Sequence, residues 1–85
     1  MKNLFYYQNL NRIKAVLSLY GIASARVKPE TDLVHDLGFR NLEMLSLMLE
    51  IEEALHAESL FDGPDGMKTI DDILLNIEKK HLVPA

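Results

Sequence analysis

The sequence has no cysteine among its 85 residues, so neither a disulfide bond nor a thiolate metal site can stabilise the fold. No uninterrupted apolar stretch approaches the roughly 20 residues that a membrane-spanning helix requires. The first residues, MKNLFYYQN, carry one lysine and a short aromatic patch broken by amides, unlike a secretory signal peptide. We therefore expect a single small domain over residues 1–85 without a membrane span, cytoplasmic and monomeric.

Acidic residues are missing from the first third of the chain and concentrated in its middle. Residues 1–29 hold five basic residues and no acid, whereas residues 30–72 hold twelve acids against Arg40 and Lys68. An acidic segment does not match the phosphates of a nucleic acid, so we expect no nucleic-acid partner. It favours a basic protein surface as partner, although the same charge can also serve solubility alone.

Catalytic patterns are also missing. The sequence has no glycine-rich phosphate loop, no metal-ligand cluster and no plausible nucleophilic triad, so we expect a protein that is not an enzyme and holds no metal. His35 and Asp36 are adjacent, but no cysteine exists and no serine is placed to complete a nucleophilic site with them. The sequence therefore predicts an exposed, structural His35.

Apolar spacing of three and four residues predicts a helix between residues 3 and 20, ended by Gly21, and a last helix that begins after Thr69. Asp72 stands where it completes a capping box with Thr69. The expected buried stripes are Leu10, Ile13, Val16, Leu17 and Tyr20 in the first helix, and Ile70, Ile73, Leu74 and Ile77 in the last.

A loop with Pro29 separates the first helix from the acidic segment, and Ile22 and Val27 are its expected anchors. Asp32 can cap a single turn that places two leucines at positions i and i+4, and Gly38 provides the left-handed exit from that turn.

Residues 41–55 predict a further helix, since they contain neither proline nor glycine. At about 100° per residue, one side of this helix forms a core face: Met44, Leu47, Met48, Ile51 and Leu55. The opposite side carries a polar stripe: Glu43, Ser46, Glu50 and Glu53. A second apolar row consists of Leu42, Leu45 and Leu49, which a helix with one buried face does not need. This row is either exposed for a partner or covered by residues 59–67 folding back.

The order of these parts resembles the acyl carrier protein family over about residues 10–80. The turn Asp36-Leu37-Gly38 leads to Arg40-Asn41-Leu42, which opens the acidic helix. In the family, an aspartate-serine-leucine stands at the latter position, and its serine carries the 4′-phosphopantetheine arm. The resemblance implies an all-α four-helix bundle with a long first loop and a short or degraded third helix around residues 59–65.

The modified serine of the family corresponds to Asn41 here. A carboxamide nitrogen has a delocalised lone pair and cannot attack the pyrophosphate of coenzyme A, whereas its oxygen can still cap a helix. Arg40 replaces an acid of the family's pattern, and Ser46 replaces a glutamate. The resemblance with these departures implies an interaction module that carries no 4′-phosphopantetheine.

The resemblance also places a partner-binding surface on the acidic helix. Its expected residues are Arg40, Leu42, Glu43, Leu45, Ser46, Leu49, Glu52 and Glu53. The implied partner is the basic surface of a synthase, transferase or ligase in lipid or secondary metabolism.

The alternative is a genuine acyl or aminoacyl carrier of fatty-acid, polyketide or related biosynthesis, modified elsewhere. Glu58-Ser59-Leu60 superficially repeats the modification tripeptide, with glutamate for aspartate, but follows the acidic helix instead of opening it. Ser46 lies within the helix, where a hydroxyl points to solvent or bonds back to a carbonyl.

Overall fold

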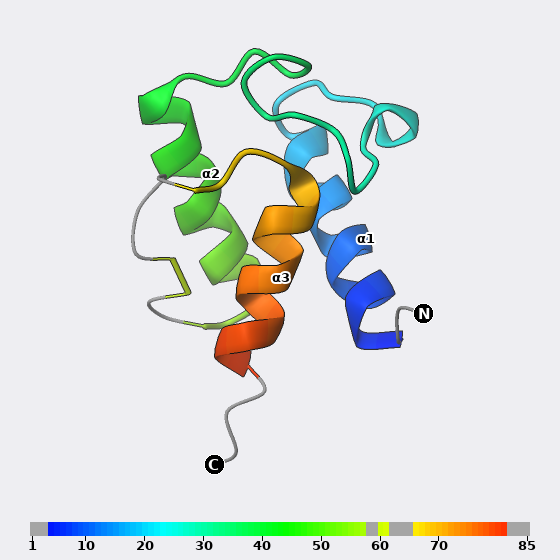
Figure 1. Ribbon diagram of the computed structural model, residues 1–85, viewed down its shortest axis with the longest axis vertical. Coiled ribbons are helices and arrows are strands. Elements are labelled where there is room, and N and C mark those ends of the chain that lie inside the picture. The colour runs from blue at the N-terminus through cyan, green and yellow to red at the C-terminus, as the bar shows by residue number, and fades with distance from the viewer. Residues whose placement is uncertain (1–3, 58–59, 62–65, 82–85) are drawn as a thin grey trace.

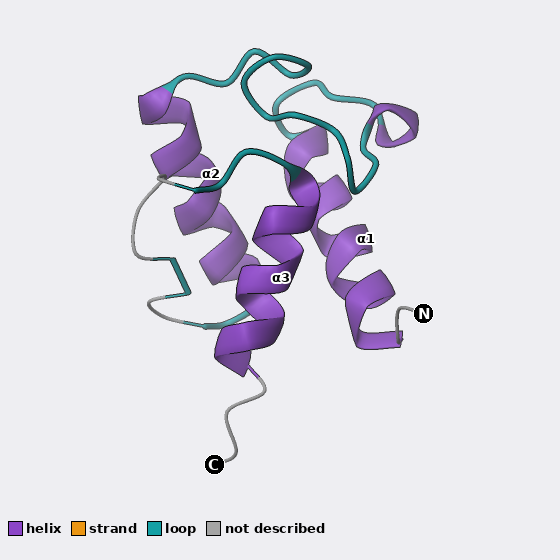
Figure 2. Ribbon diagram, viewed as in Figure 1, coloured by secondary structure: helices purple, strands orange, loops and turns teal. Residues whose placement is uncertain are grey.

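The structure, a computed structural model, describes residues 4–57, 60–61 and 66–81. These residues form three α-helices, α1 (Leu4–Ser18), α2 (Asn41–Ala54) and α3 (Ile70–His81), and one 3₁₀ helix, η1 (Ser24–Arg26). The described ranges contain no β-strand, only an isolated bridge between Asp32 and Thr69 (Figures 1 and 2). The prediction of an all-α protein is therefore confirmed. In the described ranges, no helix has the length and apolar character needed to cross a membrane.

The predicted third helix around residues 59–65 falls mostly outside the described residues. Leu60 and Phe61 are described, and they are not helical. Leu60 is nonetheless buried in the hydrophobic core, with 2% of its surface exposed, and Phe61 packs against that core. This part of the chain therefore contributes apolar side chains without a described helix.

The core lies between the three helices, and α1 packs against both α2 and α3 (Figure 1). All the positions predicted as buried on α2 and α3 are buried, as are the loop anchors Ile22 and Val27. On the first helix the prediction also holds, except that Tyr20 is half-buried and lies beyond the end of α1. Helical periodicity therefore identified the core face of each helix, because each helix buries one continuous side.

Two predicted glycine exits are confirmed. Gly21, after α1, has φ 79°, and Gly38, at the end of the Asp32 turn, has φ 75°. Both angles lie in the left-handed region that glycine enters without a steric penalty. The Asp32 side chain caps the turn, because its Oδ1 accepts the N–H groups of Val34 at 2.9 Å and His35 at 2.7 Å. His35 itself is exposed, as predicted.

The long connection between α1 and α2 runs across one end of the helices and is fixed to the segment that leads into α3 (Figure 1). Three backbone N–H groups, those of Leu33, Ile70 and Asp71, donate to the carbonyl oxygens of Lys68, Thr31 and Pro29 at 2.8, 3.1 and 2.8 Å. Leu33 is completely buried beside these bonds. The connection is therefore a fixed part of the fold, and we call its junction with the start of α3 the loop seam.

Side chains at the two ends of the loop seam satisfy further backbone groups. Thr31 is buried, and its Oγ1 accepts the N–H of Lys28 at 2.9 Å and donates to the carbonyl of Arg26 at 3.1 Å. The predicted capping box at α3 is present: Thr69 N–H donates to Asp72 Oδ2 at 3.0 Å, and Asp72 N–H donates to Thr69 Oγ1 at 3.2 Å. Both ends of the connection are thus held by hydrogen bonds that need no ligand.

A contact that the sequence did not indicate joins the start of α1 to the start of α3. The hydroxyl of Tyr6, a buried residue, donates to Asp71 Oδ1 at 2.9 Å. Burial raises the pKa of Tyr6 from 10.0 to about 12, and the hydrogen bond and negative charge of Asp71 act in the same direction. The protonated hydroxyl is therefore the stabilised form.

This contact predicts the alkaline stability of the protein. Because folding raises the pKa of Tyr6, its contribution to stability is complete below about pH 10 and is lost as the pH rises through about 12. Tyr6→Phe should lower stability at pH 8 and reduce the fall in stability between pH 10 and 12, measured by urea unfolding at each pH. Tyr7→Phe, a change at the exposed neighbouring ring, is the control and should follow the wild type. An unchanged alkaline fall in Tyr6→Phe would contradict the assignment.

Candidate functional site

The start of α2 is capped differently from the prediction. Arg40 occupies the N-cap position with extended backbone angles, and Asn41 is the first helical residue. The backbone N–H of Arg40 donates to Glu43 Oε1 at 3.0 Å. The prediction that Asn41 caps the helix is therefore wrong, because residue 41 already follows the cap position. Arg40 and Asn41 both have exposed side chains at this end of α2.

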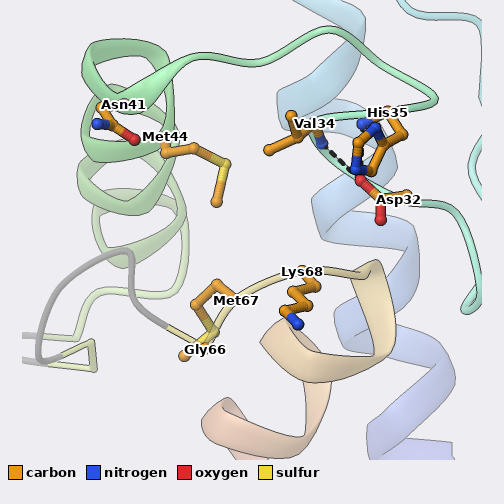
Figure 3. A pocket seen from close by; sticks show the side chains of 8 residues that line it. All are labelled: Asp32, Val34, His35, Asn41, Met44, Gly66, Met67 and Lys68. Carbon is orange, nitrogen blue, oxygen red and sulfur yellow. Dashed lines mark hydrogen bonds between the residues drawn. The ribbon is translucent and has the colours of Figure 1, made fainter.

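A cavity of about 430 Å³ opens beside Asn41 (Figure 3). Its walls come from the Asp32 turn, from the first turn of α2 and from the segment before α3: Asp32, Val34, His35, Asn41, Met44, Gly66, Met67 and Lys68. Val34 and Met44 extend toward one another from opposite sides of the opening in Figure 3. None of these eight described lining residues carries a hydroxyl or a thiol.

The second apolar row of α2 lies on the surface. Leu42 is 80% exposed, Leu45 is 43% exposed and Leu49 is 66% exposed. We call these three residues the leucine row. Their exposure follows from the helix geometry, since the core face of α2 turns its own side chains inward and leaves the row outside. Three large apolar side chains in one line form an exposed patch of the kind that binds another molecule.

Phe61 borders one side of the leucine row. It lines a groove of about 240 Å³ together with Leu45, Met48, Leu49 and Glu52. Of the segment 59–67, which the alternative prediction places over the row, the described Phe61 lies beside Leu45 and Leu49. Leu42 and Leu49 keep most of their surface accessible. Residues 59 and 62–65 of that segment lie outside the described residues.

The two predicted acids at the end of α2 have different surroundings. Glu52 Oε2 accepts the backbone N–H of Leu60 at 2.7 Å, and the Asn76 side-chain amide donates to the carbonyl of the same residue. Glu52 and Asn76 therefore hold the buried Leu60 between α2 and α3. Glu53 is exposed and borders a groove on the α1 side, near Leu19. Of the two acids, Glu52 has an evident structural role and Glu53 faces solvent.

The sequence predicted that the Ser46 hydroxyl points to solvent or bonds back to a carbonyl. Ser46 is exposed, but its hydroxyl does neither. It donates to Glu50 Oε1 at 3.2 Å, and the Tyr20 hydroxyl approaches both groups, at 3.1 Å from Ser46 Oγ and in a short hydrogen bond with Glu50. Burial and the Glu50 carboxylate raise the pKa of Tyr20. The i, i+4 spacing could have indicated the serine–glutamate pair, whereas Tyr20 comes from a distant part of the chain.

Charge is distributed unevenly along α2. Arg40 and Glu43 stand at its N-terminal end, where their charges balance, and Glu50, Glu52 and Glu53 stand in its C-terminal half. The leucine row therefore runs from an end without net charge to an acidic end.

No protein-family model matches the chain. The residues at the start of α2 and on the surface of that helix are therefore the ones from which we infer a function. The structure brings the expected partner-binding residues onto one helix and its N-cap, with Glu52 and Ser46 engaged in hydrogen bonds to other parts of the protein.

The contrast between the two neighbouring acids can be measured. Glu52→Ala should lower the free energy of unfolding by about 1–3 kcal/mol, because the N–H of the buried Leu60 loses its acceptor. Glu53→Ala should change it by less than about 0.5 kcal/mol, as is usual for an exposed side chain. Glu52→Gln keeps an acceptor oxygen and should fall between the two. Urea unfolding followed by circular dichroism measures all three, and equal stabilities for the two alanine variants would contradict the structural role of Glu52.

Proposed function

We propose that this protein is an acyl-carrier-protein-like interaction module that docks on a partner enzyme through α2 and carries no 4′-phosphopantetheine. The leucine row is the observation that carries the proposal, because two of its three side chains are more than 60% exposed without a packing role that would explain them. The proposal includes a carrier-like four-helix arrangement, with the chain around residues 59–65 in the place of the third helix.

The chemistry at the start of α2 supports a role without a prosthetic arm. Attachment of 4′-phosphopantetheine requires a side-chain oxygen that can lose a proton and attack phosphorus. At residue 41 the chain offers a carboxamide, and the preceding residue is the cation Arg40 instead of an acid. The position therefore lacks both the nucleophile and the charge that a modifying transferase would expect of a carrier.

The surface of α2 indicates what the partner offers. A leucine row bordered by Glu53 on one side and by the Phe61 groove on the other fits a hydrophobic groove with basic residues at its rim. The apolar centre holds such a complex, and the charged rim mainly steers association. By the family resemblance, we propose a synthase, transferase or ligase as the enzyme that presents this groove.

The absence of the prosthetic arm is tested by intact-mass analysis. After incubation with coenzyme A and a broad-specificity phosphopantetheinyl transferase, the wild type should remain unmodified because Asn41 supplies no hydroxyl. Asn41→Ser should be modified slowly, and Asn41→Ser with Arg40→Asp faster, since an acid then precedes the serine. An adduct on the wild type, mapped to Ser46 or Ser59, would instead establish the alternative of a genuine carrier.

Docking is tested with two variants of exposed leucines on different helices. Leu49→Glu places a charge in the leucine row, and Leu75→Glu places one on α3, where the leucine is 46% exposed. Both should keep the free energy of unfolding within about 0.5 kcal/mol, as substitutions at exposed positions do. The wild-type protein is first used to capture its partner enzyme, and the purified enzyme is then tested for binding to each of the three proteins. The wild type and Leu75→Glu should bind the enzyme, and Leu49→Glu should not. Equal binding by all three proteins would remove the leucine row as the docking surface.

A further inference from the structure

The cavity beside Asn41 has the size and the mixed lining of a small-molecule site. Its volume of about 430 Å³ lies within the range of ligand pockets, about 300–1,000 Å³, which combine apolar walls with a few polar groups. We propose that this cavity binds a small aromatic monocarboxylate without a covalent bond, with the ring against Met44 and Met67 and the carboxylate toward Lys68. The proposal does not depend on the carrier-like function or on enzyme docking, because none of the leucine row lines this cavity.

The apolar part of the lining comes from three side chains on three segments. Val34 belongs to the Asp32 turn, Met44 to the first turn of α2, and Met67 to the segment before α3 (Figure 3). Two of these three side chains are methionines, and a thioether is flexible, polarisable and favourable in contact with an aromatic ring. The apolar lining therefore favours an aromatic ring over an aliphatic group of similar size.

Lys68 supplies a positive charge to the lining. Its side chain is exposed, and its ammonium group has no hydrogen bond or ion pair with the part of the chain that the structure describes. Asp32, the one acid among the eight described lining residues, accepts the N–H groups of Val34 and His35 within its own turn. The Asp32 carboxylate is thus engaged by its own turn. One ammonium group matches the single charge of a carboxylate better than the higher charge of a phosphate group.

Backbone hydrogen bonds hold the walls of the cavity in place. The N–H of Leu33 donates to the carbonyl of Lys68 at 2.8 Å, which ties the Asp32 turn to the segment before α3. The N–H of Gly38 donates to the carbonyl of Val34 at 3.0 Å, and the N–H of Phe39 donates to the carbonyl of Leu33 at 2.9 Å, so the chain that leads to α2 is tied to the same turn. A site whose walls are already fixed loses little conformational entropy when a ligand binds.

The first experiment uses 2-naphthoate as the probe and the methyl groups of methionines as NMR reporters. Met44 and Met67 line the cavity, whereas Met48 lines the Phe61 groove beside the leucine row. Titration should shift the signals of Met44 and Met67 with saturation and a dissociation constant below about 1 mM, and should shift Met48 least. The largest shift at Met48, or no saturable shift of Met44 and Met67 up to about 10 mM, would overturn the proposal and leave enzyme docking untouched.

Two analogues separate the contributions of the charge and of the ring. The amide of 2-naphthoate has nearly the same shape without the negative charge, and the fully hydrogenated acid has the same charge without an aromatic ring. The wild type should bind the amide about fivefold more weakly than 2-naphthoate, the upper end of what an exposed ion pair contributes. It should also bind the hydrogenated acid more weakly, because the thioether contacts with a ring are lost. Equal binding of 2-naphthoate and either analogue would contradict the proposed ligand class.

Variants of Lys68 test which residue recognises the carboxylate. Lys68→Ala should bind 2-naphthoate and its amide about equally, and Lys68→Arg should keep the preference for the acid because it keeps the charge. A merely structural role of Lys68 would change the affinity for both probes alike. Lys79→Ala removes an exposed cation of α3 that does not line this cavity, and it should keep the wild-type preference. An unchanged preference in Lys68→Ala would overturn the proposed site.

A further variant fills the cavity. Val34 is 50% exposed and extends toward Met44 across the opening, so Val34→Trp should occupy the space of the ring and weaken both probes at least about tenfold. Leu75→Trp, at a leucine of α3 that is 46% exposed, is the control and should bind as the wild type does. Circular dichroism melting checks that both variants are folded. Unchanged binding by a folded Val34→Trp would overturn the proposal, and if this variant is unstable, Lys68→Ala still decides it.

Discussion

The loop seam is the constraint on which the arrangement of this small protein depends. α1 contacts both other helices, but α2 is reached only through a connection of more than twenty residues that contains Pro29. Fixing a connection of this length in one path costs conformational entropy, which its hydrogen bonds and buried side chains must offset. The backbone hydrogen bonds of Leu33, Ile70 and Asp71, together with the burial of Leu33, fix that path against the start of α3. The start of α2 and the cavity beside Asn41 are positioned by this seam.

The position of α2 explains why its surface is available for binding. Its core face packs inward, Tyr20 contacts its polar stripe through Ser46 and Glu50, and Leu60 and Phe61 adjoin its other flank. Those three contacts leave the leucine row outside. Glu52 contributes to the same result, since its bond to the N–H of Leu60 holds this flank in place. The exposed row is thus bounded on each side by residues with structural partners.

Local patterns predicted the elements of this fold, and long-range contacts escaped prediction. The core faces of α2 and α3, the Thr69 capping box and the glycine exits follow from spacing within a few residues, and the structure confirms them. The hydrogen bond between Tyr6 and Asp71 joins residues 65 positions apart, and no local sequence pattern around either residue indicates it. The same is true of Tyr20 with Glu50 and of Leu60 with Asn76. For the candidate site, periodicity predicted the second apolar row, and the structure was needed to show that it is exposed. The different surroundings of Glu52 and Glu53 depend on the position of Leu60, which no local pattern gives.

The capping of α2 determines what the fold requires of the side chain at residue 41. Had the side chain of residue 41 capped the helix, its replacement would have had to preserve an acceptor oxygen for the fold to persist. In the structure, Glu43 accepts the N–H of Arg40 instead, and Asn41 stands in the first turn with an exposed side chain. The fold therefore does not require a particular side chain at residue 41, whereas attachment of 4′-phosphopantetheine would require a hydroxyl there. The exposed leucine row begins at the next residue along α2, and its position does not depend on a cap from the side chain of residue 41.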